Sequence, residues 1–185
     1  MTNEQFLISL MVIISLIGLP ASGKTTIMKK FLASFKAKEE VVVKIPQKPR
    51  IFLTHLKSRN DVVIGRYGPG LGEFQGTDRL SMAILPAVKI WIADANRIYN
   101  NIFFEGDRLN CLSFYRCLNH KNIPFIILNL IRTEEQMALN RRNRTQPESF
   151  IKRIAGKIKN VKKEFPVTDV TAEDALRVLN RENFC

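Results

Sequence analysis

The sequence is poor in the residues that hold metal clusters and disulfide frameworks. It contains 3 cysteines and 2 histidines in 185 residues. Cys111 and Cys117 share one expected helix and Cys185 is the last residue, so their spacing fits neither zinc ligation nor a paired framework. These counts exclude a His/Cys metal centre. They also favour reduced thiols, and we expect a cytoplasmic protein.

Acidic side chains are scarce as well. The chain has 17 Asp and Glu against 29 Lys and Arg, a formal net charge of +12. Such a surplus speeds encounters with polyanions but carries no information about fold. Apolar residues make up 45% and charged residues 25%, a globular composition that excludes a disordered chain. At this length we expect one domain spanning residues 1–185.

A membrane-spanning segment is also lacking. Phe6–Leu19 is almost continuously apolar, but it is shorter than the roughly 20 residues that a spanning helix needs. The preceding Met1–Gln5 is acidic, whereas a signal peptide begins with basic residues. A buried parallel strand reads as an unbroken apolar run, so we predict a strand at Val12–Ile17 and no membrane partner. Met11 is an alternative translation start, which would leave residues 1–10 as an N-terminal extension.

Strand-like and helix-like segments alternate along the rest of the chain. Right-handed crossovers between them predict an α/β three-layer sandwich, with a mostly parallel sheet and helices on both faces. Pro86 either kinks the helix expected over 78–100 or marks a fresh start. The other expected strands are 41–45, 61–67, 101–105, 124–130 and 165–170, and the other expected helices are 24–35, 111–120, 149–163 and those that begin after Thr133 and Thr171.

Ligands of such sheets bind beyond the carboxyl ends of the strands. The loops after Ile17, Tyr67, Phe104 and Leu130 should therefore form the site.

The strongest local pattern is Gly18-Leu-Pro-Ala-Ser-Gly-Lys-Thr25, which matches G-x-x-x-x-G-K-[ST] between an apolar strand and a helix. Its glycines let the backbone wrap a phosphate with N–H groups pointing inward. The lysine supplies a mobile positive charge for the β- and γ-phosphates, and the threonine hydroxyl can bind Mg²⁺. The pattern predicts ATP binding by Gly18, Ala21, Ser22, Gly23, Lys24, Thr25 and Thr26, with Lys24 catalytic and Thr25 a metal ligand.

A second motif, Ile102–Leu109, is an apolar strand that ends in acidic residues. A carboxylate at the carboxyl end of a strand can reach Mg²⁺ directly or through water. We predict Glu105 as this ligand, with Asp107 and Arg108 in the loop beyond it. The alternative is a strand end with solvated charges.

A third motif, Gly76–Ser81, places Asp78 and Arg79 between a glycine loop and a helix. A kinase that acts on a hydroxyl uses a carboxylate to accept the proton and an arginine to steady the acceptor or the transferring phosphoryl group. Asp78 is the predicted base and Arg79 its partner. Alternatively Asp78 caps the following helix, and the two roles are compatible.

Basic residues concentrate toward the C-terminal third. Arg141, Arg142 and Arg144 lie in a lid-like segment, 141–146, where arginines would close over ATP; we assign the catalytic role to Arg142. The alternative is a solvated helix end. The wider segment 141–163 carries nine Lys and Arg, enough for a nucleic-acid backbone. A second basic zone spans residues 44–66, with Phe52, Tyr67 and Phe74 available to stack on bases. The alternative is that ATP is the only polyanion bound.

The phosphate loop and the two motifs after it resemble the P-loop nucleotide and polynucleotide kinases. The chain lacks the Asn-Lys-x-Asp signature of switch GTPases. Together with Gly65–Gly68, the motifs Gly76–Ser81 and Phe104–Leu109 resemble those of bacteriophage kinases that act on 5-hydroxymethylpyrimidine (hydroxymethyluracil) bases in DNA.

This resemblance implies ATP-dependent transfer of the γ-phosphoryl group to the hydroxymethyl oxygen, in the host cytoplasm. The residues leave two alternatives open: a kinase for nucleosides or nucleoside monophosphates, and a nucleotide-dependent nucleic-acid-binding protein.

Overall fold

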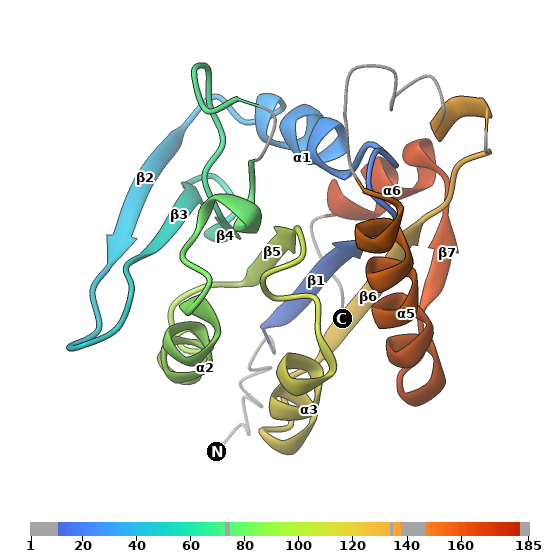
Figure 1. Cartoon of the computed structure of the whole chain (residues 1–185). Coiled ribbons are helices and arrows are strands. Elements are labelled where there is room, and N and C mark those ends of the chain that lie inside the picture. Colours follow the sequence, from blue (N-terminus) through green and yellow to red (C-terminus); the bar gives the residue numbers. More distant parts are fainter. Residues whose placement is uncertain (1–10, 73–74, 134, 138–146, 182–185) are drawn as a thin grey trace, which may run out of the picture.

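The computed structural model describes residues 11–72, 75–133, 135–137 and 147–181. Strands and helices alternate along them (Figure 1). In chain order the elements are β1 (Val12–Ile17), α1 (Lys24–Ala33), β2 (Lys38–Val43), β3 (Ile51–Leu56), β4 (Asp61–Ile64), the 3₁₀ turn η1 (Thr77–Arg79), α2 (Ile84–Ala95), β5 (Asn101–Glu105), α3 (Leu112–His120), β6 (Phe125–Leu130), α5 (Glu148–Glu164), β7 (Thr168–Val170) and α6 (Ala172–Leu179).

The strands form one sheet in the order β2-β3-β4-β5-β1-β6-β7. The pairs from β4 to β7 are parallel, and β3 runs antiparallel to both of its neighbours. Helices α1 and α6 contact each other on one face, while α2, α3 and α5 form the second helical layer. Figure 1 shows the sheet between these layers. The predicted α/β three-layer sandwich is confirmed.

The alternation of side chains along β1 explains why the sheet is covered on both faces. Every residue of β1 is buried. Ile13 and Ile17 pack with α2, α3 and α5, whereas Ile14 and Leu16 pack with α1 and α6. Successive side chains of a strand point to opposite faces, so a strand buried on both sides must be apolar throughout.

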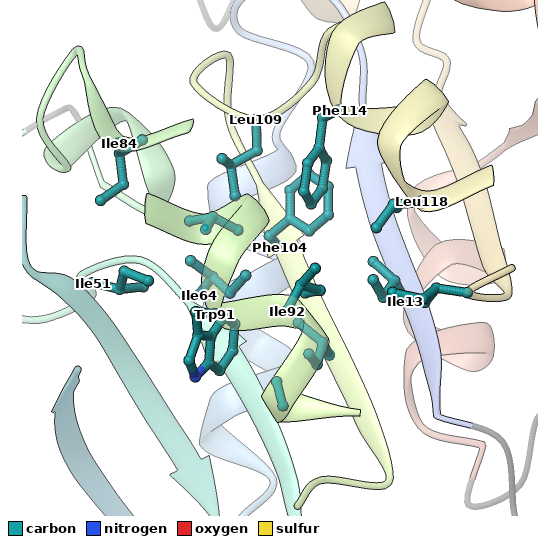
Figure 2. Packing of buried hydrophobic residues seen from close by; sticks show 14 of the residues in the cluster. Ile13, Ile51, Ile64, Ile84, Trp91, Ile92, Phe104, Leu109, Phe114 and Leu118 are labelled. Carbon is teal, nitrogen blue, oxygen red and sulfur yellow. The ribbon is translucent and has the colours of Figure 1, made fainter. Parts of the chain in front are cut away.

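Aromatic side chains fill the first of these layers. Figure 2 shows Phe104 of β5 against Phe114 of α3, with ring centroids 5.6 Å apart in an edge-to-face arrangement. Trp91 of α2 lies in the same cluster. Two rings in this geometry contribute about 0.5–1.5 kcal/mol beyond their buried area. This packing fixes β5 and α3, which flank the loop that follows Glu105.

Three expectations about the elements need correction. The region between 46 and 60 contains a strand, β3, which the sequence did not indicate because Pro46 and Pro49 precede it. The helix expected from 78 is a 3₁₀ turn followed by a separate helix from Ile84. Pro86 is the third residue of α2, within the first turn, where proline removes no intrahelical hydrogen bond. The last strand is shorter than 165–170.

The apolar run at the start of the chain forms the predicted buried strand from Val12 onward, while residues 1–10 lie outside the described part. In the part of the chain that the structure describes, no helix combines the length and apolar character that crossing a membrane requires.

Candidate functional site

The predicted phosphate loop, Gly18–Thr25, follows β1. Its small residues permit its backbone conformation. Gly18, Ala21 and Gly23 have φ values of 148°, 65° and 95°. A Cβ on Gly18 would lie 2.9 Å from the carbonyl oxygen of Leu130 and 2.9 Å from Ser22 Oγ. Glycine therefore allows the loop to press against the end of β6. Helix α1 begins at Lys24 and directs its first N–H groups into the loop, which favours an anion there.

Ser22 supports the assignment of this loop to phosphate binding. Its hydroxyl oxygen is buried and has no hydrogen-bond partner among the described residues. A buried hydroxyl without a partner is costly, and a bound phosphate oxygen would satisfy it.

Lys24 lies at the centre of the site. Its Nζ donates to the carbonyl oxygens of Gly18 at 2.9 Å and Leu19 at 3.0 Å. Burial raises the pKa values of Glu105 and Asp78, and the charge of Lys24 opposes this rise in both. The ammonium group is thus placed between the phosphate loop and both predicted carboxylates.

Thr25 and Glu105 come together from α1 and the end of β5. The threonine hydroxyl donates to Glu105 Oε1 at 3.0 Å, and the hydroxyl of Tyr67 is 3.5 Å from the same oxygen. Burial, opposed by the charge of Lys24, raises the pKa of Glu105 to about 7. Hydroxyl and carboxylate oxygens suit Mg²⁺, which proteins usually hold by one or two side chains together with substrate phosphates. The two side chains therefore fit a magnesium ion.

Asp78 reaches the site through contacts between distant segments. Arg66 and Gly76 exchange backbone hydrogen bonds of 3.1 and 2.8 Å, which close the loop after β4. The buried hydroxyl of Thr77 then donates to the carbonyl oxygen of Glu105 at 2.8 Å. As a result, Asp78 Oδ1 accepts the backbone N–H of Asp107 at 2.6 Å.

The capping alternative for Asp78 is wrong. Helix α2 begins at Ile84 with Ala83 as its N-cap residue, and the N–H of Ala83 bonds to Ser81 Oγ at 3.2 Å. The Asp78 carboxylate points instead to the loop after β5. Burial raises the pKa of Asp78, against the hydrogen bond from Asp107. A raised pKa brings a carboxylate closer to the range in which it can exchange a proton near neutral pH.

One cavity unites most of these groups. Lys24, Thr25, Asp78 and Glu105 line it together with the glycines Gly18 and Gly106. Residues of α5 complete its lining. Arg79 is exposed and does not line the cavity, and neither does Thr26, which is also exposed. Arg142 and the lid-like segment 141–146 lie outside the described residues, as does Phe74.

Sequence reasoning did not find several polar groups around the cavity. Asn110 lines it and donates to the carbonyl oxygens of Gly106 at 2.6 Å and Leu16 at 3.4 Å, so it ties the loop after β5 to the end of β1. The hydroxyl of Tyr115 donates to Asn110 Oδ1 at 2.6 Å. Leu16 is 94 residues from Asn110 in sequence, while Gly106 and Tyr115 are near it but form no known motif with it, so no local pattern marks these contacts.

Arg132, after β6, is a second unforeseen residue. Its guanidinium lies against the phosphate loop, 3.2 Å from where a Cβ on Gly23 would stand. Its Nε is buried without a hydrogen-bond partner among the described residues. The guanidinium is therefore positioned to contact a bound phosphate.

Helix α5 carries the basic residues expected to meet nucleic acid. Four of them form ion pairs within the chain. Lys152 pairs with Glu148, Lys162 with Asp169, and both Arg153 and Lys157 with Asp107. The predicted stacking residues Phe52 and Tyr67 are half-buried, and Arg66 lies over the ring of Phe52 at 4.7 Å.

Comparison with known proteins adds little to this geometry. No protein-family model matches the chain, and no curated protein matches it. Among solved structures the chain is similar to a gluconokinase from Sinorhizobium meliloti 1021, with 12% sequence identity, a TM-score of 0.45, and coverage of 91% of this chain and 87% of that one. This level of similarity supports no conclusion about chemistry.

Proposed function

We propose that the protein is an ATP-dependent phosphotransferase. The observation that carries this proposal is the convergence of Lys24, Thr25, Glu105 and Asp78 on one cavity beside the phosphate loop. A cationic group, a metal-binding pair and a separate carboxylate are the parts that phosphoryl transfer to a hydroxyl requires.

Each residue has a distinct part in the proposed reaction. The N–H groups of the loop hold the ATP phosphates, with Ser22 Oγ and Lys24 Nζ contacting their oxygens. Thr25 and Glu105 would hold Mg²⁺, which neutralises charge on the phosphates when bound. Asp78 accepts the proton of the acceptor hydroxyl. The hydroxyl oxygen bonds to the γ-phosphorus, and the bond from this phosphorus to the β–γ bridging oxygen breaks, so that ADP leaves.

Glu105 is the poorer choice for the base. Its Oε1 already accepts a hydrogen bond from Thr25, a residue of the phosphate loop. Asp78 lines the same cavity, and its Oδ1 accepts the backbone N–H of Asp107 in the loop after β5 rather than a hydrogen bond from the phosphate loop. Arg79 and Arg142 remain predicted contacts of the acceptor and of ATP.

The acceptor we favour is the 5-hydroxymethyl group of a modified pyrimidine in DNA, as in phage DNA hypermodification. The basic character of α5 and the resemblance of three motifs to phage DNA-base kinases support this choice. The base would leave the stack to reach Asp78.

A small-molecule nucleoside or nucleoside monophosphate kinase is the second candidate. It is favoured by the ion pairs of Lys152, Arg153, Lys157 and Lys162, because these pairs leave less positive charge for a long polyanion. The third candidate, a nucleotide-dependent nucleic-acid-binding protein, would show nucleic-acid binding without transfer.

A transfer assay with radiolabelled γ-phosphate distinguishes the three. Labelling of duplex DNA that contains hydroxymethyluracil supports the DNA-base kinase, with unmodified duplex as the control. Label on free nucleosides or monophosphates alone contradicts it and supports the second candidate. DNA binding with no label on any acceptor supports the third.

A further inference from the structure

One part of the cavity wall is a face of α5. Phe150, Ile154 and Lys157 line the cavity from this face. Arg153, between them in sequence, places its guanidinium 4.9 Å from the centre of the Phe150 ring. An aromatic ring and the cation of Lys157 thus line the same cavity as Asp78 and the phosphate loop, and a second cation, Arg153, lies beside the ring.

The charges on this wall are unbalanced. Lys157 Nζ lies 2.8 Å from Asp107 Oδ1, and Arg153 lies 3.5 Å from Asp107 Oδ2. One carboxylate therefore serves two cations, which leaves one positive charge in excess within the trio. The Lys157 side chain is 32% exposed and that of Arg153 is 51% exposed, so both can reach a bound anion.

The trio is also joined directly to the proposed base. The backbone N–H of Asp107 donates to Asp78 Oδ1 at 2.6 Å, and the side chain of the same residue holds Lys157. Asp107 would therefore lie between Lys157, with its bound anion, and the carboxylate of Asp78 that takes the acceptor proton.

Resting on the proposed function, we infer that this face of α5 is the acceptor subsite and that it selects a nucleotide. The Phe150 ring packs against the acceptor base, while Lys157 and Arg153 bind the phosphate next to it. Aromatic rings stack on any base, and a guanidinium beside an ammonium suits a phosphate. A neutral nucleoside offers no group for the cations, and an open-chain sugar acid offers no planar face for the ring.

The ion pairs with Asp107 also anchor α5 to the loop after β5. The test must therefore separate binding of the acceptor phosphate from stabilisation of the fold. We choose Lys157→Gln and Phe150→Leu, with Lys121→Gln as the charge-matched control. Lys121 is exposed and lies just before β6, at the amino ends of the strands and thus opposite the site. Thermal unfolding of each variant first confirms that it is folded.

The acceptors are a single-stranded oligonucleotide with one hydroxymethyluracil and the corresponding free nucleoside. For the oligonucleotide, we expect Lys157→Gln to raise KM by about 10-fold or more, the effect of losing a charged hydrogen bond. Phe150→Leu should raise it by about 5-fold or more, the effect of losing one stacked base. KM for ATP should stay at the wild-type value in both variants. For the nucleoside, kcat/KM should be unchanged by Lys157→Gln but lowered by Phe150→Leu, because the nucleoside keeps the base that stacks on the ring and lacks the phosphate. Lys121→Gln should change nothing. Equal losses on both acceptors for Lys157→Gln, or an unchanged KM for the oligonucleotide in either variant, would overturn the inference.

If no acceptor is phosphorylated, the proposed function is wrong, but the subsite can still be tested by measuring binding without ATP. Fluorescence anisotropy of the labelled oligonucleotide should then show weaker binding by Lys157→Gln and a log Kd–log salt slope reduced by about 1. The same affinity and slope as wild type would refute the subsite.

Discussion

The buried carboxylate of Glu105 should make the protein less stable as the pH rises. The pKa of this group is about 7 in the folded protein against an ordinary value of 4.5, chiefly because of burial. The folded state therefore holds the proton more tightly than the unfolded chain. The stability that this carboxyl contributes is fully present below pH 4.5 and is lost as the pH rises through 7.

The size of the effect follows from the shift. The difference between 7 and 4.5 is 2.5 pKa units, and at about 1.36 kcal/mol per unit this corresponds to about 3 kcal/mol. Glu105→Gln cannot ionise but keeps an oxygen that can accept the hydrogen bond from Thr25. The amide has its own packing cost, which is the same at every pH. The unfolded carboxyl is already mostly ionised at pH 5, so not all of this free energy is lost between pH 5 and pH 8. The change in unfolding free energy caused by the substitution should thus be more favourable at pH 8 than at pH 5 by about 2.5 kcal/mol.

Urea unfolding at pH 5 and pH 8, with a chelator and without nucleotide, measures this difference. The shift in the pKa of Asp78 contributes to both proteins and largely cancels. Glu105→Gln should also weaken Mg²⁺-dependent activity, so the substitution exchanges function for stability. An identical pH dependence in wild type and variant would refute the reasoning.

Three further predictions test particular contacts, two of them with a control substitution. Asp78→Asn should lower kcat by about 100-fold or more with an unchanged ATP dissociation constant, and a parallel loss of ATP affinity would speak against a base. Gly76→Ala places a Cβ against the Glu105 carboxylate at φ 68°, so urea unfolding should show a loss of at least about 1–3 kcal/mol; Gly70→Ala, which has open space at φ 79°, should cost less. Arg59→Ala leaves buried Asp61 without its 2.7 Å ion pair and should cost about 3–5 kcal/mol, whereas Lys57→Ala, in an exposed pair with Glu39, should cost about 0–1 kcal/mol; equal costs would contradict the role of burial.

The sequence predicted best those elements whose cause lies within a single segment. The strand Val12–Ile17 and the loop after it follow from an apolar run and a glycine pattern, and both have the predicted bounds. Asn101–Glu105 was predictable for the same reason. The loops expected to meet beyond the strands do meet, as the contacts of Thr25 and Tyr67 with Glu105 show.

The rest depended on contacts between distant segments. The position of Asp78 is set by the Arg66–Gly76 bridge and by Thr77, 28 residues from Glu105. The pairing of Lys157 with Asp107 spans 50 residues, so the sequence showed a basic helix but not which of its faces meets the cavity. The sequence did not predict strand β3 because Pro46 and Pro49 interrupt the region before it. Both prolines lie before Ile51, so they do not prevent the strand from pairing with β2 and β4.

The most direct test of phosphoryl transfer compares wild type with Lys24→Ala. Both proteins are given ATP with a labelled γ-phosphate, Mg²⁺ and an oligonucleotide with one hydroxymethyluracil, and the label on the purified oligonucleotide is counted over time. Lys24 Nζ lies at the mouth of the phosphate loop, so we expect steady labelling by wild type and none above background by the variant. Equal labelling by the two proteins would contradict the account, as would a wild type that labels no hydroxyl acceptor.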